Sequence, residues 1–160
     1  MRRMASRSAG ILLHRAGTGG LEVLLVHPGG PYWAKRDLGA WSIPKGEYGD
    51  DEDARACALR EFTEEIGTPP PDGAELVELG EVRQKNGKVV TAWAVEGDVD
   101  AAAIRSNTFS IEWPPRSGRT QEFPEVDRAE WFDPETARRK ILPAQADLID
   151  RLLELLSSGP

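Results

Sequence analysis

Residues 46–68 read GEYGDDEDARACALREFTEEIGT, and this stretch decides the fold. Asp53 is a suitable N-cap for a helix, and the alanines that follow it favour helix formation. Gly67 suits the left-handed residue that ends a helix, and the three prolines shortly after it prevent the helix from continuing. The sequence therefore predicts one short helix between Asp53 and Gly67.

Three glutamates of this helix share one face. Glu61 and Glu65 lie one turn apart, and Glu64 lies on the flank of the same face. Like charges at this spacing destabilise a bare helix, whereas Mg²⁺ takes carboxylate oxygens as ligands and bridges to phosphates. Arg60 lies one turn before Glu64 and can pair with that carboxylate. The alternative for the three glutamates alone is an acidic helix face exposed to solvent.

The complete pattern of this stretch resembles the signature of the Nudix hydrolase family, GX5EX7REUXEEXGU. Thr68 stands where the family usually has an aliphatic residue, at a position that packs rather than reacts. The resemblance implies an α/β (α+β) protein with a Nudix-type α/β/α sandwich and a mixed β-sheet, over nearly the full length. The positions that match the signature are Gly46, Glu52, Arg60, Glu61, Phe62, Glu64, Glu65 and Gly67.

Apolar runs separated by turn residues predict the strands around this helix. Strands are predicted over residues 8–15, 21–27, 75–83, 88–96 and 127–132. The first two form a hairpin across Gly17–Gly20, and the next two form a hairpin with a two-residue turn at Asn86–Gly87. Residues 28–44 and 97–124 read as irregular segments. Residues 135–156 predict a helix with a break at Pro143.

Composition limits the class of protein. A chain of 160 residues suits a single domain over residues 1–160, with residues 1–7 expected to be flexible. The net charge of −7 argues against a stable nucleic-acid complex. The single Cys57 excludes an internal disulfide, and the sequence lacks the apolar runs of a signal peptide or a membrane span. We therefore expect a cytoplasmic protein with no membrane partner, whose oligomeric state the sequence leaves open.

The resemblance implies a metal-dependent hydrolase. The carboxylates of Glu61, Glu64 and Glu65 would bind Mg²⁺, for which Mn²⁺ can substitute. The carbonyl oxygen of Gly46 is a family ligand that maps by position. The ions would polarise a phosphoryl group and lower the pKa of a bound water.

A general base must then take a proton from that water. The family draws this base from the helix or from a loop near a later strand, so Glu61 and Glu64 are candidates on the helix. The candidate in the loop is Glu125, six residues before Trp131, and Glu122 is the second choice. The alternative is that Glu125 is an ordinary exposed acid.

Cationic and aromatic side chains outside the helix are candidates for substrate binding. Lys45 stands directly before Gly46, where its ammonium could reach a phosphate, or it is a solvated lysine. Arg116 and Arg119 suit a long anionic chain, or they serve solubility. Trp33, in a loop rich in glycine and proline, could stack on a purine or simply pack.

The sequence thus predicts a Mg²⁺-dependent pyrophosphohydrolase whose small-molecule substrate is a nucleoside triphosphate or a dinucleoside polyphosphate. Residues 109–132 resemble a bacterial subgroup of Nudix proteins described only as predicted NTP pyrophosphohydrolases. The alternative is a catalytically silent module of Nudix fold that binds or senses a nucleotide. The three glutamates argue against it, because a pure binder does not need a charged cluster that requires metal.

Overall fold

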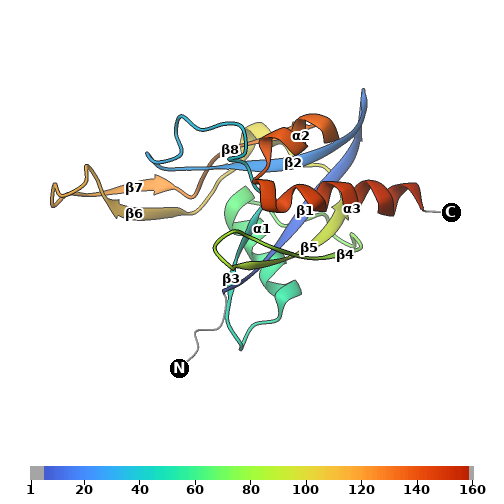
Figure 1. The fold of residues 1–160 in the computed structure, drawn as a ribbon, viewed down its shortest axis with the longest axis horizontal. Helices are drawn as coiled ribbons and strands as arrows, with labels where there is room; N and C mark the ends of the chain where they lie inside the picture. Colours follow the sequence, from blue (N-terminus) through green and yellow to red (C-terminus); the bar gives the residue numbers. More distant parts are fainter. Residues whose placement is uncertain (1–5, 159–160) are drawn as a thin grey trace.

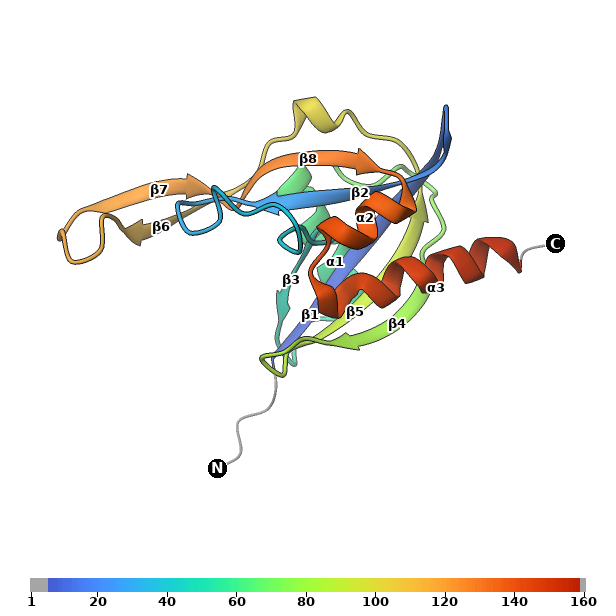
Figure 2. The same cartoon turned by 45° about the horizontal axis from the view of Figure 1, so that its top comes forward.

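A computed structural model describes residues 6–158, and it has a six-stranded mixed sheet with helices on both faces (Figures 1 and 2). The sheet has the strand order β4-β5-β1-β2-β8, and β3 pairs with β1 beside this path. Its strands are β1 (Arg7–Gly17), β2 (Gly20–Pro28), β3 (Lys45–Tyr48), β4 (Val77–Arg83), β5 (Val89–Glu96) and β8 (Val126–Phe132). The expected flexible segment 1–7 falls mostly on residues 1–5, outside the described residues, and Arg7 begins β1.

Strand β1 organises the sheet. It runs parallel to β5 and antiparallel to both β2 and β3, so the predicted mixed sheet is confirmed. On one edge, β1 pairs with β3 through residues 7–10 and with β2 through residues 14–17. Residues 41–44 fill the gap between these two partners, since Ile11 donates to the Pro44 carbonyl and Val26 donates to the Ser42 carbonyl. Strands β2 and β3 therefore do not pair with each other, and residues 41–44 lie between them.

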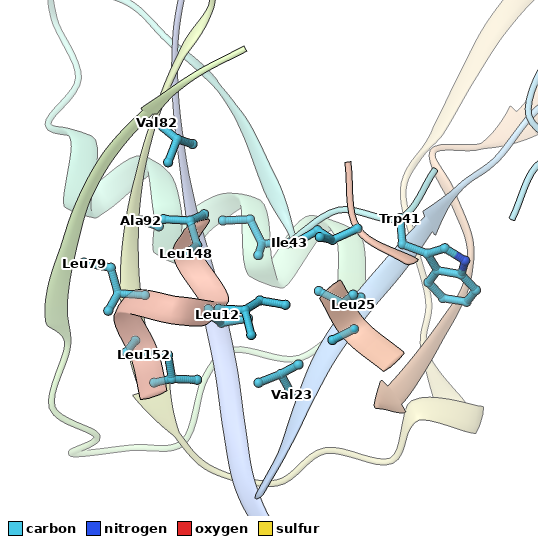
Figure 3. Packing of buried hydrophobic residues seen from close by; sticks show 14 of the residues in the cluster. Leu12, Val23, Leu25, Trp41, Ile43, Leu79, Val82, Ala92, Leu148 and Leu152 are labelled. Atoms are coloured by element: carbon cyan, nitrogen blue, oxygen red, sulfur yellow. The ribbon is translucent and has the colours of Figure 1, made fainter. Parts of the chain in front are cut away.

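Alternating apolar residues of β1 and β2 build one core on each face of the sheet. Ile11, Leu13 and Leu24 lie on the face of α1 (Ala54–Ile66), in a cluster that includes Phe62 and Cys57. The other face holds a second cluster under α3 (Ala146–Ser157), shown in Figure 3. Its labelled members are Leu12, Val23, Leu25, Trp41, Ile43, Leu79, Val82, Ala92, Leu148 and Leu152.

Helix α1 has both predicted caps. The Asp53 side chain accepts a hydrogen bond from the Ala56 backbone N–H at 3.1 Å. Gly67 adopts the left-handed conformation with a φ of 96° and donates to the Thr63 carbonyl. A Cβ atom at position 67 would also lie 2.8 Å from the Arg105 carbonyl oxygen, so glycine is required there for two reasons.

The prediction that residues 97–124 are irregular is wrong. They contain a short 3₁₀ helix, η1 (Ala101–Ala103), and a hairpin of β6 (Thr108–Glu112) and β7 (Thr120–Pro124). This hairpin, called the arm below, projects from the body of the molecule (Figure 1). Each of its strands has only five residues, of which only β6 alternates polar and apolar residues, and residues 113–119 between them are too many for a two-residue turn.

Two smaller features also differ from prediction. Strand β3 lies where a loop was expected, because its four residues are stabilised by pairing with β1 and not by an apolar pattern. The turn between β4 and β5 has three central residues, 85–87, since Gln84 donates to the Lys88 carbonyl and Gly87 donates to the Gln84 carbonyl. The residue added to the predicted turn is Lys85, and Gly87 at the end of the turn has a φ of 88°.

The predicted break at Pro143 is confirmed. It separates α2 (Pro134–Lys140) from α3, with a 3₁₀ turn, η2 (Pro143–Gln145), between them. Leu142 is extended, as expected for a residue before proline. Within residues 6–158, the helices are too short or too polar to cross a membrane.

Gln145 joins this C-terminal region to the segment before β3. Its side chain is fully buried, and its Oε1 accepts a hydrogen bond from the Ile43 N–H at 3.1 Å. Its Nε2 donates to Ser42 Oγ at 3.1 Å and to Gln84 Oε1 at 3.2 Å. One buried amide therefore satisfies polar groups from two other parts of the chain, residues 42–43 and Gln84.

Gln145→Ala should lower the free energy of unfolding by about 1–3 kcal/mol, because it leaves the Ile43 N–H buried without an acceptor. Chemical denaturation measures the change. The matched control is Gln121→Ala, which removes an exposed glutamine of the arm and should change stability by less than about 0.5 kcal/mol. Equal losses in the two variants would contradict the structural role of Gln145.

Candidate functional site

The first residue of the signature, Gly46, lies against the first glutamate of the helix. A Cβ atom at position 46 would lie 2.0 Å from Glu61 Cδ, so any side chain there would displace the carboxylate. Cys57 Sγ donates to the Gly46 carbonyl oxygen at 3.4 Å, and its burial raises the thiol pKa to about 11. The cysteine is packed in the core, and its raised pKa disfavours the reactive thiolate.

Arg60 connects the other charged residues of the signature. Its Nε and Nη2 donate to the two oxygens of Glu52, each at 2.9 Å, in a bidentate pair. Its Nη1 donates to Glu61 at 2.9 Å and to Glu64 at 3.3 Å. The hydrogen bonds to Glu52 are the largest cause of a raised Arg60 pKa. The predicted pairing with Glu64 is present, and Glu52 supports the helix through Arg60.

Burial raises the pKa values of two carboxylates of α1, those of Glu61 and Glu65. The pKa of Glu65 is raised to about 8, first by burial and then by the charge of Glu61. Burial is also the first cause of the raised pKa of Glu61, and the charge of Glu64 is the second. Glu125 raises the pKa of both Glu61 and Glu65, although it lies far away in the sequence.

Glu125 is held beside the helix by backbone hydrogen bonds. The N–H groups of Arg105 and Asn107 donate to the carbonyls of Ile66 and Glu64 at the end of α1. The Asn107 carbonyl in turn accepts a hydrogen bond from the Glu125 N–H at 2.8 Å. Burial first, and then the charge of Glu64, raises the Glu125 pKa. Residues 105–107 therefore position Glu125, although the sequence contains no signal for this role.

Lys45 lies beside Glu65. Burial lowers its pKa, while the charge of Glu65 opposes that effect. The Lys45 backbone N–H donates to Glu65 Oε1 at 3.3 Å. Lys45 is therefore half-buried next to a carboxylate, and the alternative of a freely solvated lysine is wrong.

Some of these residues line a cavity of about 200 Å³, called the inner cavity below. Its charged lining residues are Lys45, Glu65 and Glu125, and Trp33 contributes to its wall. Val26, Ile43 and Leu142 add apolar surface, and no local motif would have marked them as lining residues. The cavity lies between β2 and β3, since Val26 and Lys45 both line it. Its apolar wall borders the acidic face of α1 at Glu65.

The structure separates the other candidates from this cavity. Glu122 is exposed on β7 and accepts a hydrogen bond from Thr108. It does not line the inner cavity, although it is only three residues from Glu125 in the sequence. Arg116 and Arg119 lie in the exposed connection at the end of the arm, and neither lines the inner cavity.

The donor set of the site fits a hard divalent cation. Burial first, and then mutual repulsion, raises the pKa values of Glu61, Glu65 and Glu125, and a bound cation would offset both effects. In the described part of the chain, no three acidic, thiol or imidazole groups already surround one point at metal-binding distance. Arg60 instead contacts oxygens of Glu61 and Glu64.

Comparison with known proteins decides the family. The profile of the NUDIX domain matches residues 4–152, which is most of the chain. The chain belongs to the Nudix hydrolase family. This family assignment makes it a Nudix pyrophosphohydrolase in the general sense, and Nudix enzymes generally use divalent metal ions. The comparison of this Nudix chain with curated proteins finds no match.

Solved structures share the fold of this Nudix chain. The Ap4A hydrolase of C. elegans, in a binary complex, has 18% identity and a TM-score of 0.69 over 95% of this chain and 99% of that one. The NUDIX domain of Shewanella oneidensis NrtR, complexed with ADP ribose, has 20% identity and a TM-score of 0.66 over 97% and 90%. A mutT/nudix family protein of Listeria innocua has 14% identity and a TM-score of 0.63 over 98% and 96%. The predicted Nudix fold is confirmed.

The raised pKa of Glu65 predicts that the metal-free protein loses stability as pH rises. Its folded pKa of about 8 exceeds the ordinary value of 4.5, so the folded state holds a proton that the unfolded state releases. This contribution to stability is fully present below pH 4.5 and is lost as pH rises through about 8. With a chelator present, the Tm should fall by about 5 °C between pH 5 and pH 8.5.

Glu65→Gln should remove most of this fall, because glutamine stays neutral across the range. The matched control is Glu78→Gln, an exposed glutamate of β4, which should keep the wild-type slope of Tm against pH. A wild-type slope in Glu65→Gln would show that other groups cause the pH dependence.

Proposed function

We propose that the chain, acting as one Nudix domain, is a Mg²⁺-dependent pyrophosphohydrolase of a nucleoside triphosphate or a dinucleoside polyphosphate. The observation that carries this proposal is the convergence of four carboxylates from α1 and a distant loop, two of which, Glu65 and Glu125, line the inner cavity together with Lys45. The free, buried Cys57 fits a reducing compartment, and we propose a cytoplasmic location.

In this proposal, Glu61, Glu64, Glu65 and the Gly46 carbonyl oxygen hold Mg²⁺, and Mn²⁺ can substitute for it. When bound, the ion neutralises phosphate charge and makes a coordinated water more acidic. Arg60 keeps its bidentate contact with Glu52, and this contact fixes the helix face that carries the glutamates.

Glu125 accepts a proton from the attacking water in this mechanism. Its raised pKa makes it a stronger base than an exposed glutamate, and its backbone contacts with residues 105–107 keep it beside the helix. The water oxygen bonds to one phosphorus atom, and the bridging oxygen leaves with the other phosphoryl group. Glu61 and Glu64 are the next candidates for the base, because they belong to the same cluster.

Lys45 and Trp33 position the substrate. Lys45 lines the inner cavity beside Glu65, and its ammonium binds a non-bridging phosphate oxygen. Trp33 offers its ring to a nucleobase at the apolar end of the inner cavity. Arg116 and Arg119 stay a prediction for the far end of a long anionic chain, since they do not line this cavity.

The structural neighbours support a nucleotide as the substrate. One is an Ap4A hydrolase, and another is a NUDIX domain complexed with ADP ribose. Both names point to an adenine nucleotide with linked phosphates. We therefore place the substrate of this chain among nucleotides that contain a phosphoanhydride.

A panel of nucleoside triphosphates, dinucleoside polyphosphates and ADP ribose, incubated with and without Mg²⁺, tests the proposal. Phosphate release and product identification in ¹⁸O-labelled water report the bond that is cleaved. Turnover that depends on Mg²⁺ supports the enzyme. Nucleotide binding without turnover across the panel would favour the alternative, a silent binding or sensing module.

Glu64→Gln should lower Mg²⁺-dependent turnover by about 10²-fold or more, because it replaces a hard anionic ligand by a neutral amide. Steady-state kinetics over a Mg²⁺ titration measure the effect. Glu78→Gln, which alters an exposed glutamate outside the inner cavity, is the control and should behave as wild type. Near-wild-type kinetics in Glu64→Gln would overturn the assignment of the metal ligands.

Glu125→Gln should lower kcat by about 10²–10⁴-fold with little change in KM, and should flatten the acidic limb of the pH–rate profile. The matched control is Glu122→Gln, three residues away on the exposed strand of the arm, which should change kcat by less than about threefold. If the two variants exchange these effects, Glu122 is the base. If neither variant loses activity, the base belongs to the helix.

A further inference from the structure

A second cavity, of about 320 Å³, lies between the β2–β3 loop (residues 29–44) and the arm. We call it the outer cavity. It shares three lining residues, Pro28, Trp33 and Glu125, with the inner cavity. Tyr32 from the loop and Phe109 and Ile111 from the arm complete its walls. Trp33 and Glu125 therefore stand between two adjoining compartments.

The walls of the outer cavity are held together by close backbone contacts. A Cβ atom at Gly29 would lie 1.9 Å from the Pro124 carbonyl oxygen, and one at Gly30 would lie 2.9 Å from Phe109 Cζ. Gly29 also donates to the Glu125 carbonyl at 2.9 Å. Glycine at both positions thus lets the loop lie directly against the arm.

An aromatic contact also joins the β2–β3 loop to the arm. The rings of Tyr32, from the loop, and Trp113, at the end of β6, meet edge-to-face with centroids 5.3 Å apart. The loop and the arm are therefore in contact at Gly29 and Gly30 and again at Tyr32 and Trp113.

The lining of the outer cavity selects a planar, uncharged group. Tyr32, Trp33 and Phe109 are aromatic, Ile111 is aliphatic, and Glu125 is the one charged residue among the described residues that line it. A carboxylate without a neighbouring cation in the lining repels phosphate, whereas aromatic rings stack on any nucleobase. Its volume falls at the lower end of the range for small-molecule sites, which suits one base or nucleoside.

We propose that the outer cavity is a second subsite, which binds a nucleobase at the distal end of the substrate. This inference rests on the proposed function, because it requires the phosphates to lie between the two compartments, beside Lys45 and Glu125. The preferred substrate is then a polyphosphate esterified with a nucleoside at both ends, rather than a nucleoside triphosphate. The arm acts as a specificity element.

Binding of two charge-matched probes tests the subsite. The first is P1,P4-di(nucleoside) tetraphosphate, and the second is the δ-methyl ester of the same nucleoside tetraphosphate, each in adenine and guanine versions. The probes have the same phosphate number and charge, and only the first carries a second nucleoside. Calorimetry with Ca²⁺ in place of Mg²⁺ should give a Kd about tenfold lower for the two-ended probe. Equal Kd values, or no binding of either probe, would overturn the subsite.

Variants of the arm locate the effect. Ile111→Ser should reduce the ratio of the two Kd values to about threefold or less, while Ile111→Leu should retain it, because leucine keeps the apolar surface. Phe109→Ala should reduce the ratio in the same way. Phe123→Ala is its control, because Phe123 faces Phe109 across the arm with centroids 6.2 Å apart but does not line the cavity. Loss of the ratio in Phe123→Ala as well would overturn the direct contact.

Hydrolysis of the same probes with Mg²⁺ separates the two proposals. A tenfold ratio of Kd values without any hydrolysis would overturn the proposed function and support the subsite. Hydrolysis of both probes with equal Kd values would overturn the subsite and support the proposed function. The comparison of probes on the wild-type protein needs no variant, so it stands even if an arm variant fails to fold.

Discussion

Crowded negative charge between α1 and the Glu125 loop is the constraint on which the rest of the site depends. Glu61, Glu65 and Glu125 each have a raised pKa, because burial disfavours their charged forms and neighbouring carboxylates add to that effect. Arg60 offsets only part of this repulsion, on the exposed side of the cluster. Such an arrangement works against stability in the absence of a cation, and local conflicts of this kind are expected at functional sites.

Local patterns predicted five of the strands and the ends of α1, whereas the sandwich was implied by the family resemblance. The continuous apolar runs of β1 and β2 predicted strands, and their successive residues point to opposite faces, so Leu12 lies in one core and Ile11 in the other. The caps at Asp53 and Gly67 predicted the ends of α1, because each cap is a local hydrogen bond. The arm and β3 were not predicted, because both are short and depend on pairing with a partner strand.

The contiguous signature predicted the helical part of the candidate site, and Lys45, Trp33 and Glu125 were predicted outside it. Gly46 and Glu61 belong to that signature, and the structure places them in contact. The position of Glu125 depends instead on backbone hydrogen bonds from residues 105–107 to the end of α1, and no residue type is needed for those bonds. Arg116 was chosen for its charge, but its location depends on the direction of the arm, which is a property of the fold.

The proposed chemistry and the proposed specificity belong to different parts of the molecule. Gly46 and the glutamates of α1 lie on a strand and a helix that pack on the central sheet, where many buried contacts resist local opening. The arm is a two-stranded hairpin, and such a hairpin is marginal alone, so its order depends on contacts with the loop at Gly29 and Gly30. Changes in the arm can therefore alter the outer cavity while the carboxylate cluster keeps its support from the sheet. Glu125 belongs to both parts, because it directly follows β7 of the arm and lines both cavities. A change at Glu125 would therefore affect both the proposed proton transfer and the proposed nucleobase subsite.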